Sequence, residues 1–302
     1  MNENILNHYI QVGAFTNPGC YREFMQNLPD DIEELGTLVC HQVIHRMILS
    51  QGNTGMNTDK RYGDMEEFPW FRLRCDDDVL TTAVSMIAEL LRLDNRGFTQ
   101  ERKVEHKIVV TCRFVSILMA AILKAKGKPC RVRSGFASYL SDGKESIDHW
   151  INQCWDEQRQ RWITFDADGF FNQLDFDQYD IPENKFDWAA DTWLGIRNGS
   201  LQPDNFINLG GFKGLMPALW ALFYDFHSLM NNEILYMQQP SYIDKKFDTL
   251  NKDNFLEIDE LAVLMLDPDK SFYELKDIWN TKKKYRILNS PLIGDDSHVR
   301  WR

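Results

Sequence analysis

One stretch limits the possible folds of this chain more than any other. Residues 111–126 read TCRFVSILMAAILKAK and are apolar on nearly all sides of a helix. A helix with this pattern is buried over most of its surface, so other elements must cover it. Gly127 can cap its C-terminus and Pro129 cannot continue it. The sequence therefore predicts a core helix that begins at about Cys112, with the rest of the fold packed around it.

Three strand-like segments follow this helix. Residues 130–136 read as a strand, and residues 149–155 and 161–166 read as two more. The short polar loop at 156–160 predicts that the last two strands form a hairpin. A helix followed by antiparallel strands indicates an α+β fold.

The flanking regions read mostly as helix. Further helices are expected from Asp30 to Gly52, from 79 to 97 after the acidic residues 76–78, and at 214–237, 258–266 and 272–280. We find no repeat and no linker, so the chain is interpreted as one domain of 302 residues. It divides into a helical N-terminal part (1–98), a catalytic core (99–180) and a mostly helical C-terminal extension (181–302).

Three residues of the core could form a nucleophilic site. A reactive thiol needs a lowered pKa, a nearby base and a group that orients this base. Cys112 lies where the core helix begins, and the partial positive charge there favours the thiolate. His149 begins one strand of the predicted hairpin and Asp166 ends the other, which places a carboxylate within reach of an imidazole. The alternative is that Cys112 is a small buried hydrophobe, the commonest fate of a free cysteine.

A set of motifs in the same region resembles the transglutaminase-like superfamily. That family has a Cys at a helix N-terminus, a G-x-P-A-R strand, a His before Trp and a W-x-x-x-D strand. Here the matching residues are, in order, Cys112 with its helix, 127–131 (GKPCR), 135–137 (GFA), 148–150 (DHW) and 162–166 (WITFD). Residues 28–32, 193–198 and 219–233 extend a softer resemblance to small bacterial transglutaminase-domain proteins.

The departures from this pattern leave all three site residues in place. Cys130 stands where the family has the Ala of its P-A-R strand, and Gln153 and Cys154 stand where many relatives carry an acidic residue.

The resemblance implies a papain-like core and a Cys112-His149-Asp166 triad that acts on amide bonds of proteins or peptides. The outcome would be transamidation, deamidation or hydrolysis, and no cofactor is implied. A non-catalytic interaction module on the same fold is the alternative. The backbone N–H of Cys112 is a plausible oxyanion donor, whereas for the second donor the sequence offers only Trp70, an upstream aromatic residue.

Three other features allow competing interpretations. His41 and His45, four residues apart on the predicted first helix, could hold a metal, but a fourth ligand is missing and the interpretation as surface or core histidines is favoured. Asp168 is the rival of Asp166 for the third triad position. Arg131 and Arg133 alternate on one strand and could steer an acidic substrate or form structural ion pairs.

The bulk composition excludes several functional classes. The formal net charge of −11 and the pI of about 5.1 argue against a nucleic-acid binder, which needs a basic face. The apolar runs at 114–123 and 215–226 are too short to span a bilayer, and the first residues do not resemble a secretory signal. The six cysteines are scattered without a CxxC pair. These features predict a cytoplasmic protein that binds neither membranes nor nucleic acid, and they leave its oligomeric state open.

Overall fold

A computed structural model describes residues 1–46, 68–72, 76, 79–141, 144–168, 174–236, 238–244 and 249–287. The helices are α1 (Glu3–Ile10), α2 (Arg22–Gln26), α3 (Ile32–Cys40), α5 (Ala83–Leu93), α6 (Cys112–Ala125), α7 (Ala189–Asn198), α8 (Leu215–Leu229), α9 (Ser241–Asp244), α10 (Lys252–Met265) and α11 (Phe272–Thr281). The strands are β1 (Val43–His45), β2 (Ile108–Val110), β3 (Cys130–Ala137), β4 (Ser146–Asp156), β5 (Arg161–Phe165), β6 (Asp187–Trp188) and β7 (Phe206–Ile207). The α+β class is confirmed, whereas the division into three parts stays a prediction.

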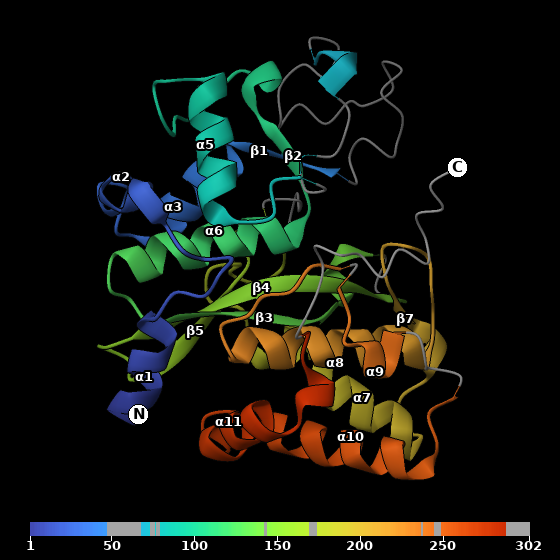
Figure 1. Cartoon of the computed structure of the whole chain (residues 1–302). Coiled ribbons are helices and arrows are strands. Elements are labelled where there is room, and N and C mark those ends of the chain that lie inside the picture. The colour runs from blue at the N-terminus through green and yellow to red at the C-terminus, as the bar shows by residue number, and fades with distance from the viewer. Residues whose placement is uncertain are drawn as a thin grey trace.

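The main sheet lies between two layers of helices. Its strands follow the order β5-β4-β3-β6, with β7 paired to β4, and the predicted hairpin of β4 and β5 is present. In Figure 1, α6 and the helices α2, α3 and α5 lie on one side of this sheet, and α8 with α7, α10 and α11 lies on the other. Strands β1 and β2 form a separate parallel pair. Within the described part of the chain, no helix has both the length and the apolar character needed to cross a bilayer.

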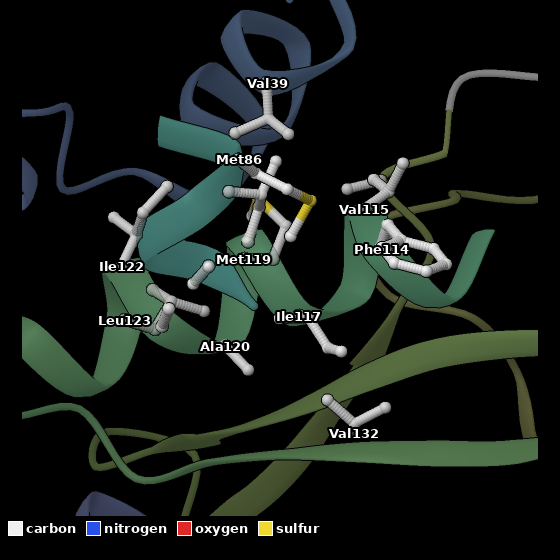
Figure 2. Packing of buried hydrophobic residues seen from close by; sticks show 14 of the residues in the cluster. Val39, Met86, Phe114, Val115, Ile117, Met119, Ala120, Ile122, Leu123 and Val132 are labelled. Carbon is white, nitrogen blue, oxygen red and sulfur yellow. The ribbon is translucent and has the colours of Figure 1, made fainter. Parts of the chain in front are cut away.

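The core helix predicted from the sequence is α6, and every residue in it is buried. Figure 2 shows Ile117 directed toward Val132 of β3, while Met119 lies on the opposite side of the helix near Met86 of α5. Each large apolar side chain buried in this way stabilises the fold by roughly 1.5–3 kcal/mol. Because both sides of α6 are packed, the residue at its N-terminus, Cys112, has a fixed position.

The prediction of one continuous helix from Asp30 to Gly52 is wrong at residues 41–45. Helix α3 ends at Cys40, and the chain then forms β1, which pairs in parallel with β2. Val43 and Ile44 are β-branched and fully buried, and a strand partner is available to them only in the folded protein. The predicted end at Gly52 lies outside the described residues.

Three other helix boundaries also differ from the prediction. Helix α5 begins at Ala83, where the Thr82 side chain caps it, and not near Val79. Helix α8 ends at Leu229 rather than near residue 237, and Asn231 follows with a positive φ of 55°. Helix α10 begins at Lys252, one turn and a half before the predicted start, with Asn251 as its cap. In each case the side-chain cap or the turn residue sets the boundary, and the hydrophobic pattern alone does not reveal it.

Arg131 and Arg133 of β3 are held in buried ion pairs. Arg133 makes two bonds to Asp225 of α8, from Nε to Oδ1 at 2.8 Å and from Nη2 to Oδ2 at 2.9 Å. Arg131 donates to Asp269 at 2.6 Å, and both arginines also donate to Oε1 of Gln153. The exposed fractions of the arginines are only 3% and 4%, so the idea that they steer an acidic substrate is wrong.

We expect Asp225→Ala to destabilise the fold strongly. The substitution leaves the Arg133 guanidinium buried without its carboxylate, which typically costs about 3–5 kcal/mol. Urea unfolding measures this loss directly. Asp175→Ala, which removes an exposed pair with Lys185, is the matched control and should leave the unfolding curve close to that of the wild type. Equal curves for the two variants would contradict the importance of the buried pair.

Candidate active site

Cys112 is the first residue of α6 and follows directly on β2. The extended backbone of Thr111, with φ −103° and ψ 174°, separates the strand from the helix. The first N–H groups of a helix have no partner within it, and the macrodipole places partial positive charge there. The thiol therefore lies where an anion is stabilised, although only 1% of the residue is exposed. Its Sγ lies 3.1 Å from the hydroxyl of Tyr236.

His149 lies on β4, opposite Gly135 of β3. Its Nε2 is 2.7 Å from Oδ2 of Asp166, which leaves Nδ1 for the contact with Cys112. Burial on its own would lower the pKa of His149. The negative charges of Asp166 and Cys112, each also hydrogen-bonded to the ring, outweigh burial and hold this pKa well above its usual value. An imidazole placed between a thiol and a carboxylate is the arrangement that a cysteine nucleophile requires.

Asp166 follows the last residue of β5. In the register of the hairpin, Asn152 opposes Phe165, so Asp166 is the diagonal neighbour of His149 rather than its direct partner. Its Oδ2 accepts bonds from His149 and from the hydroxyl of Tyr139 at 3.0 Å. Its Oδ1 accepts from the backbone N–H of Asp168 at 3.0 Å. Both oxygens are therefore fixed, and the carboxylate can orient the imidazole.

Asp168, the rival for the third position, does not contact His149 in the same way. Its Oδ2 lies 3.3 Å from Nε2 of His45, while Asp166 occupies the place beside Nε2 of His149. The structure thus brings Cys112, His149 and Asp166 together. Their catalytic roles remain a prediction.

Two tyrosines, Tyr139 and Tyr236, contact the site, and the sequence did not indicate either of them. Burial, followed by the charge of Asp166, raises the pKa of Tyr139 well above its usual value, so its hydroxyl keeps the proton that it donates. Burial and the charge of Cys112 likewise raise the pKa of Tyr236. Neither residue has a motif that marks it. Tyr236 comes from the loop after α8, 124 residues from Cys112, and only the folded chain places it at the sulphur.

His41 and His45, considered above as a metal pair, lie on different elements. His41 is the residue that follows α3, whereas His45 ends β1, so the two do not share a helix face. Burial, then the neighbouring His149, lowers the pKa of His45 to about 3 and keeps its ring neutral. Across the residues that the structure describes, no cluster of three or more His, Cys, Asp or Glu side chains could hold a metal ion.

The remaining cysteines that the structure describes have different surroundings. Burial raises the pKa of the Cys130 thiol well above its usual value and that of Cys154 to about 12, so both stay protonated at neutral pH. Cys20 is exposed. Cys75 and the side chain of Trp70, named above as an oxyanion donor, lie outside the described part of the chain.

Part of this chain is similar to known proteins. Residues 99–167, which include all three site residues, match the model of the transglutaminase-like superfamily. Among solved structures, a candidate cysteine protease from Cytophaga hutchinsonii is similar, with a TM-score of 0.36 and 14% sequence identity. The match covers 63% of this chain and 50% of that chain, so the similarity extends over about half the length of the solved protein. No curated protein matches the chain in sequence.

Proposed function

We propose, from the membership of residues 99–167 in the transglutaminase-like superfamily, that this protein is a cysteine-dependent acyl-transfer enzyme acting on amide bonds. The observation that carries the proposal is the contact chain of Cys112, His149 and Asp166 at the N-terminus of a buried helix. The superfamily supports a cysteine-dependent enzyme. The triad and the acyl transfer are our inference.

The first half-reaction follows from the charges in the site. The Cys112 thiolate attacks the carbonyl carbon of an amide, and the carbonyl oxygen takes the negative charge. The backbone N–H of Cys112 and the hydroxyl of Tyr236, 3.1 Å from the sulphur, are the donors that we assign to this oxygen. His149 gives its proton to the leaving amine, and a thioester with Cys112 remains.

The second half-reaction regenerates the thiol. His149, now neutral, takes a proton from an incoming amine or water molecule, which attacks the thioester carbonyl. An amine acceptor gives transamidation. Water gives deamidation when the donor is a glutamine or asparagine side chain, and peptide hydrolysis when the donor is a peptide bond.

A paired activity screen tests this proposal. Wild type and Cys112→Ala are incubated with a glutamine-containing protein and a fluorescent primary amine, and released ammonia and incorporated label are read together. Incorporation of the fluorescent amine together with release of ammonia indicates transamidation. Release of ammonia without incorporation indicates deamidation. The absence of both, and of peptide cleavage, in the wild type would favour the non-catalytic interaction module.

We expect Cys112 to be the most reactive cysteine near neutral pH. Exposure alone would favour Cys20, whereas the helix N-terminus and the contact with His149 favour reaction at the buried Cys112. Mass-spectrometric mapping after brief treatment with limiting iodoacetamide measures the order of labelling.

His149→Ala is the matched control, and it should remove the preference for Cys112 without blocking the labelling of Cys20. Faster labelling of Cys20 or Cys75 in the wild type would count against an activated Cys112.

A further inference from the structure

We propose that His45 and Asp168 form a positioning pair that fixes the Asp166 carboxylate and keeps its position constant relative to Cys112. This inference rests on the proposed function, because it assigns roles around the same site. Neither residue contacts Cys112 in the arrangement described above. Their effect on the chemistry would pass through Asp166.

The contacts form one continuous chain into the site. Nε2 of His45 lies 3.3 Å from Oδ2 of Asp168, and both residues are buried, with exposed fractions of 5% and 2%. The backbone N–H of Asp168 donates to Oδ1 of Asp166 at 3.0 Å. The other oxygen of Asp166 contacts His149 at 2.7 Å. Any rotation of the chain at Asp168 therefore moves the group that orients the imidazole.

The pair also joins two parts of the fold that carry different members of the site. His45 ends β1 and is aligned with Val110, the last residue of β2, two residues before Cys112. Asp168 comes three residues after the end of β5, and β5 is a strand of the main sheet. The described strands of these two sheets do not pair with each other. The contact of His45 with Asp168 thus connects the segment that carries the nucleophile to the segment that carries Asp166.

Burial and the neighbouring charges determine the protonation state of His45. The titratable groups near it include Asp168, Asp166 and His149, and its ring stays neutral because it is buried and beside the charged His149. A neutral imidazole has a single N–H. With this proton on Nε2, the ring directs its N–H side toward Oδ2 of Asp168, 3.3 Å away, and does not compete with His149 for Asp166. Replacing the ring with an apolar side chain would place a group that cannot donate beside the buried Asp168 carboxylate, which favours a shift of Asp168.

The test compares three substitutions of His45. His45→Leu removes the donor, and His45→Gln restores it, because the Gln amide nitrogen can occupy the place of Nε2. His45→Asn is a polar control whose shorter side chain reaches only the place of Nδ1, and it serves in place of His45→Leu if that variant does not fold. His8→Leu, which removes a half-buried histidine bonded to the carbonyl of Leu229, controls for the loss of any packed histidine.

We measure kcat and KM for amine incorporation, the pH dependence of Cys112 alkylation, and unfolding in urea. His45→Leu and His45→Asn should lower kcat roughly 10- to 100-fold with little change in KM, the size expected for a small misplacement of a catalytic group. The limb of the alkylation profile that reports His149 should move to lower pH, because a looser Asp166 supports the imidazolium less. His45→Gln should recover most of the loss, and His8→Leu should leave kcat unchanged.

Two outcomes would overturn the inference alone. One is a folded His45→Leu protein with the kcat and alkylation profile of an active wild type, and the other is a His45→Gln protein as impaired as His45→Leu. A wild type with no turnover and no preferential labelling of Cys112 would instead overturn the proposed function, and this inference with it.

Discussion

Cys112→Ser should abolish turnover and leave the fold intact. Oxygen is smaller than sulphur, so the buried position, which is 1% exposed, accommodates the hydroxyl, and the start of a helix accepts Ser well. The hydroxyl is a far poorer nucleophile, because the same surroundings do not bring its ionisation near neutral pH. We expect ammonia release and amine incorporation to fall below detection. The unfolding midpoint should stay within a few degrees of the wild type, since about 1 kcal/mol shifts a chain of this size by roughly 2–4 °C.

Cys20→Ser is the control for this substitution, because it exchanges the same atoms at an exposed site and should retain full turnover. The opposite pattern of results would show that Cys112 has a role in packing and not in catalysis. In that pattern Cys112→Ser unfolds at a much lower temperature and still turns over substrate at the wild-type rate.

The central part of the fold could be predicted because its signals are local. A helix that is apolar on all sides has to be buried, and α6 begins at Cys112 as predicted. The short polar loop at 156–160 predicted the hairpin of β4 and β5. Motif spacing in the same region pointed to Cys112, His149 and Asp166, which the fold brings into contact.

The residues that surround this site could not be predicted, because distant segments supply them. Val43–His45 forms a strand only when β2 lies beside it. The helical pattern upstream of this segment therefore led to the prediction of a helix that continues through residues 43–45. His45 was therefore placed on the same helix as His41, whereas the strand brings it beside Asp168. Tyr236 was assigned to a helix that ends before it. A single sequence contains no spacing that reveals such tertiary contacts.

The hydrogen bonds of Asp166 make Asp166→Asn a sharp test of the third position. In the wild type one oxygen accepts from His149 and Tyr139, and the other accepts from the backbone N–H of Asp168. An amide has one oxygen and one NH₂ group. If its oxygen faces Asp168, the NH₂ group opposes two donors and forces His149 to carry its proton on the nitrogen that faces Cys112. If its oxygen faces His149, the NH₂ group opposes the backbone N–H of Asp168.

We therefore expect Asp166→Asn to lower kcat by roughly 10³- to 10⁴-fold without abolishing turnover, the effect seen when a triad histidine is held in the wrong tautomer. Loss of the carboxylate charge should also lower the pKa of His149, which is raised by Asp166 in the wild type. The His149 limb of the alkylation profile should then move to lower pH, and turnover should fall most at neutral pH, where the imidazolium is no longer maintained. Asp175→Asn, at an exposed position, is the control and should match the wild type in both measurements. If Asp166→Asn kept wild-type kcat while Asp168→Asn lost it, Asp168 would be the third member of the triad, and the assignment of Asp166 would be wrong.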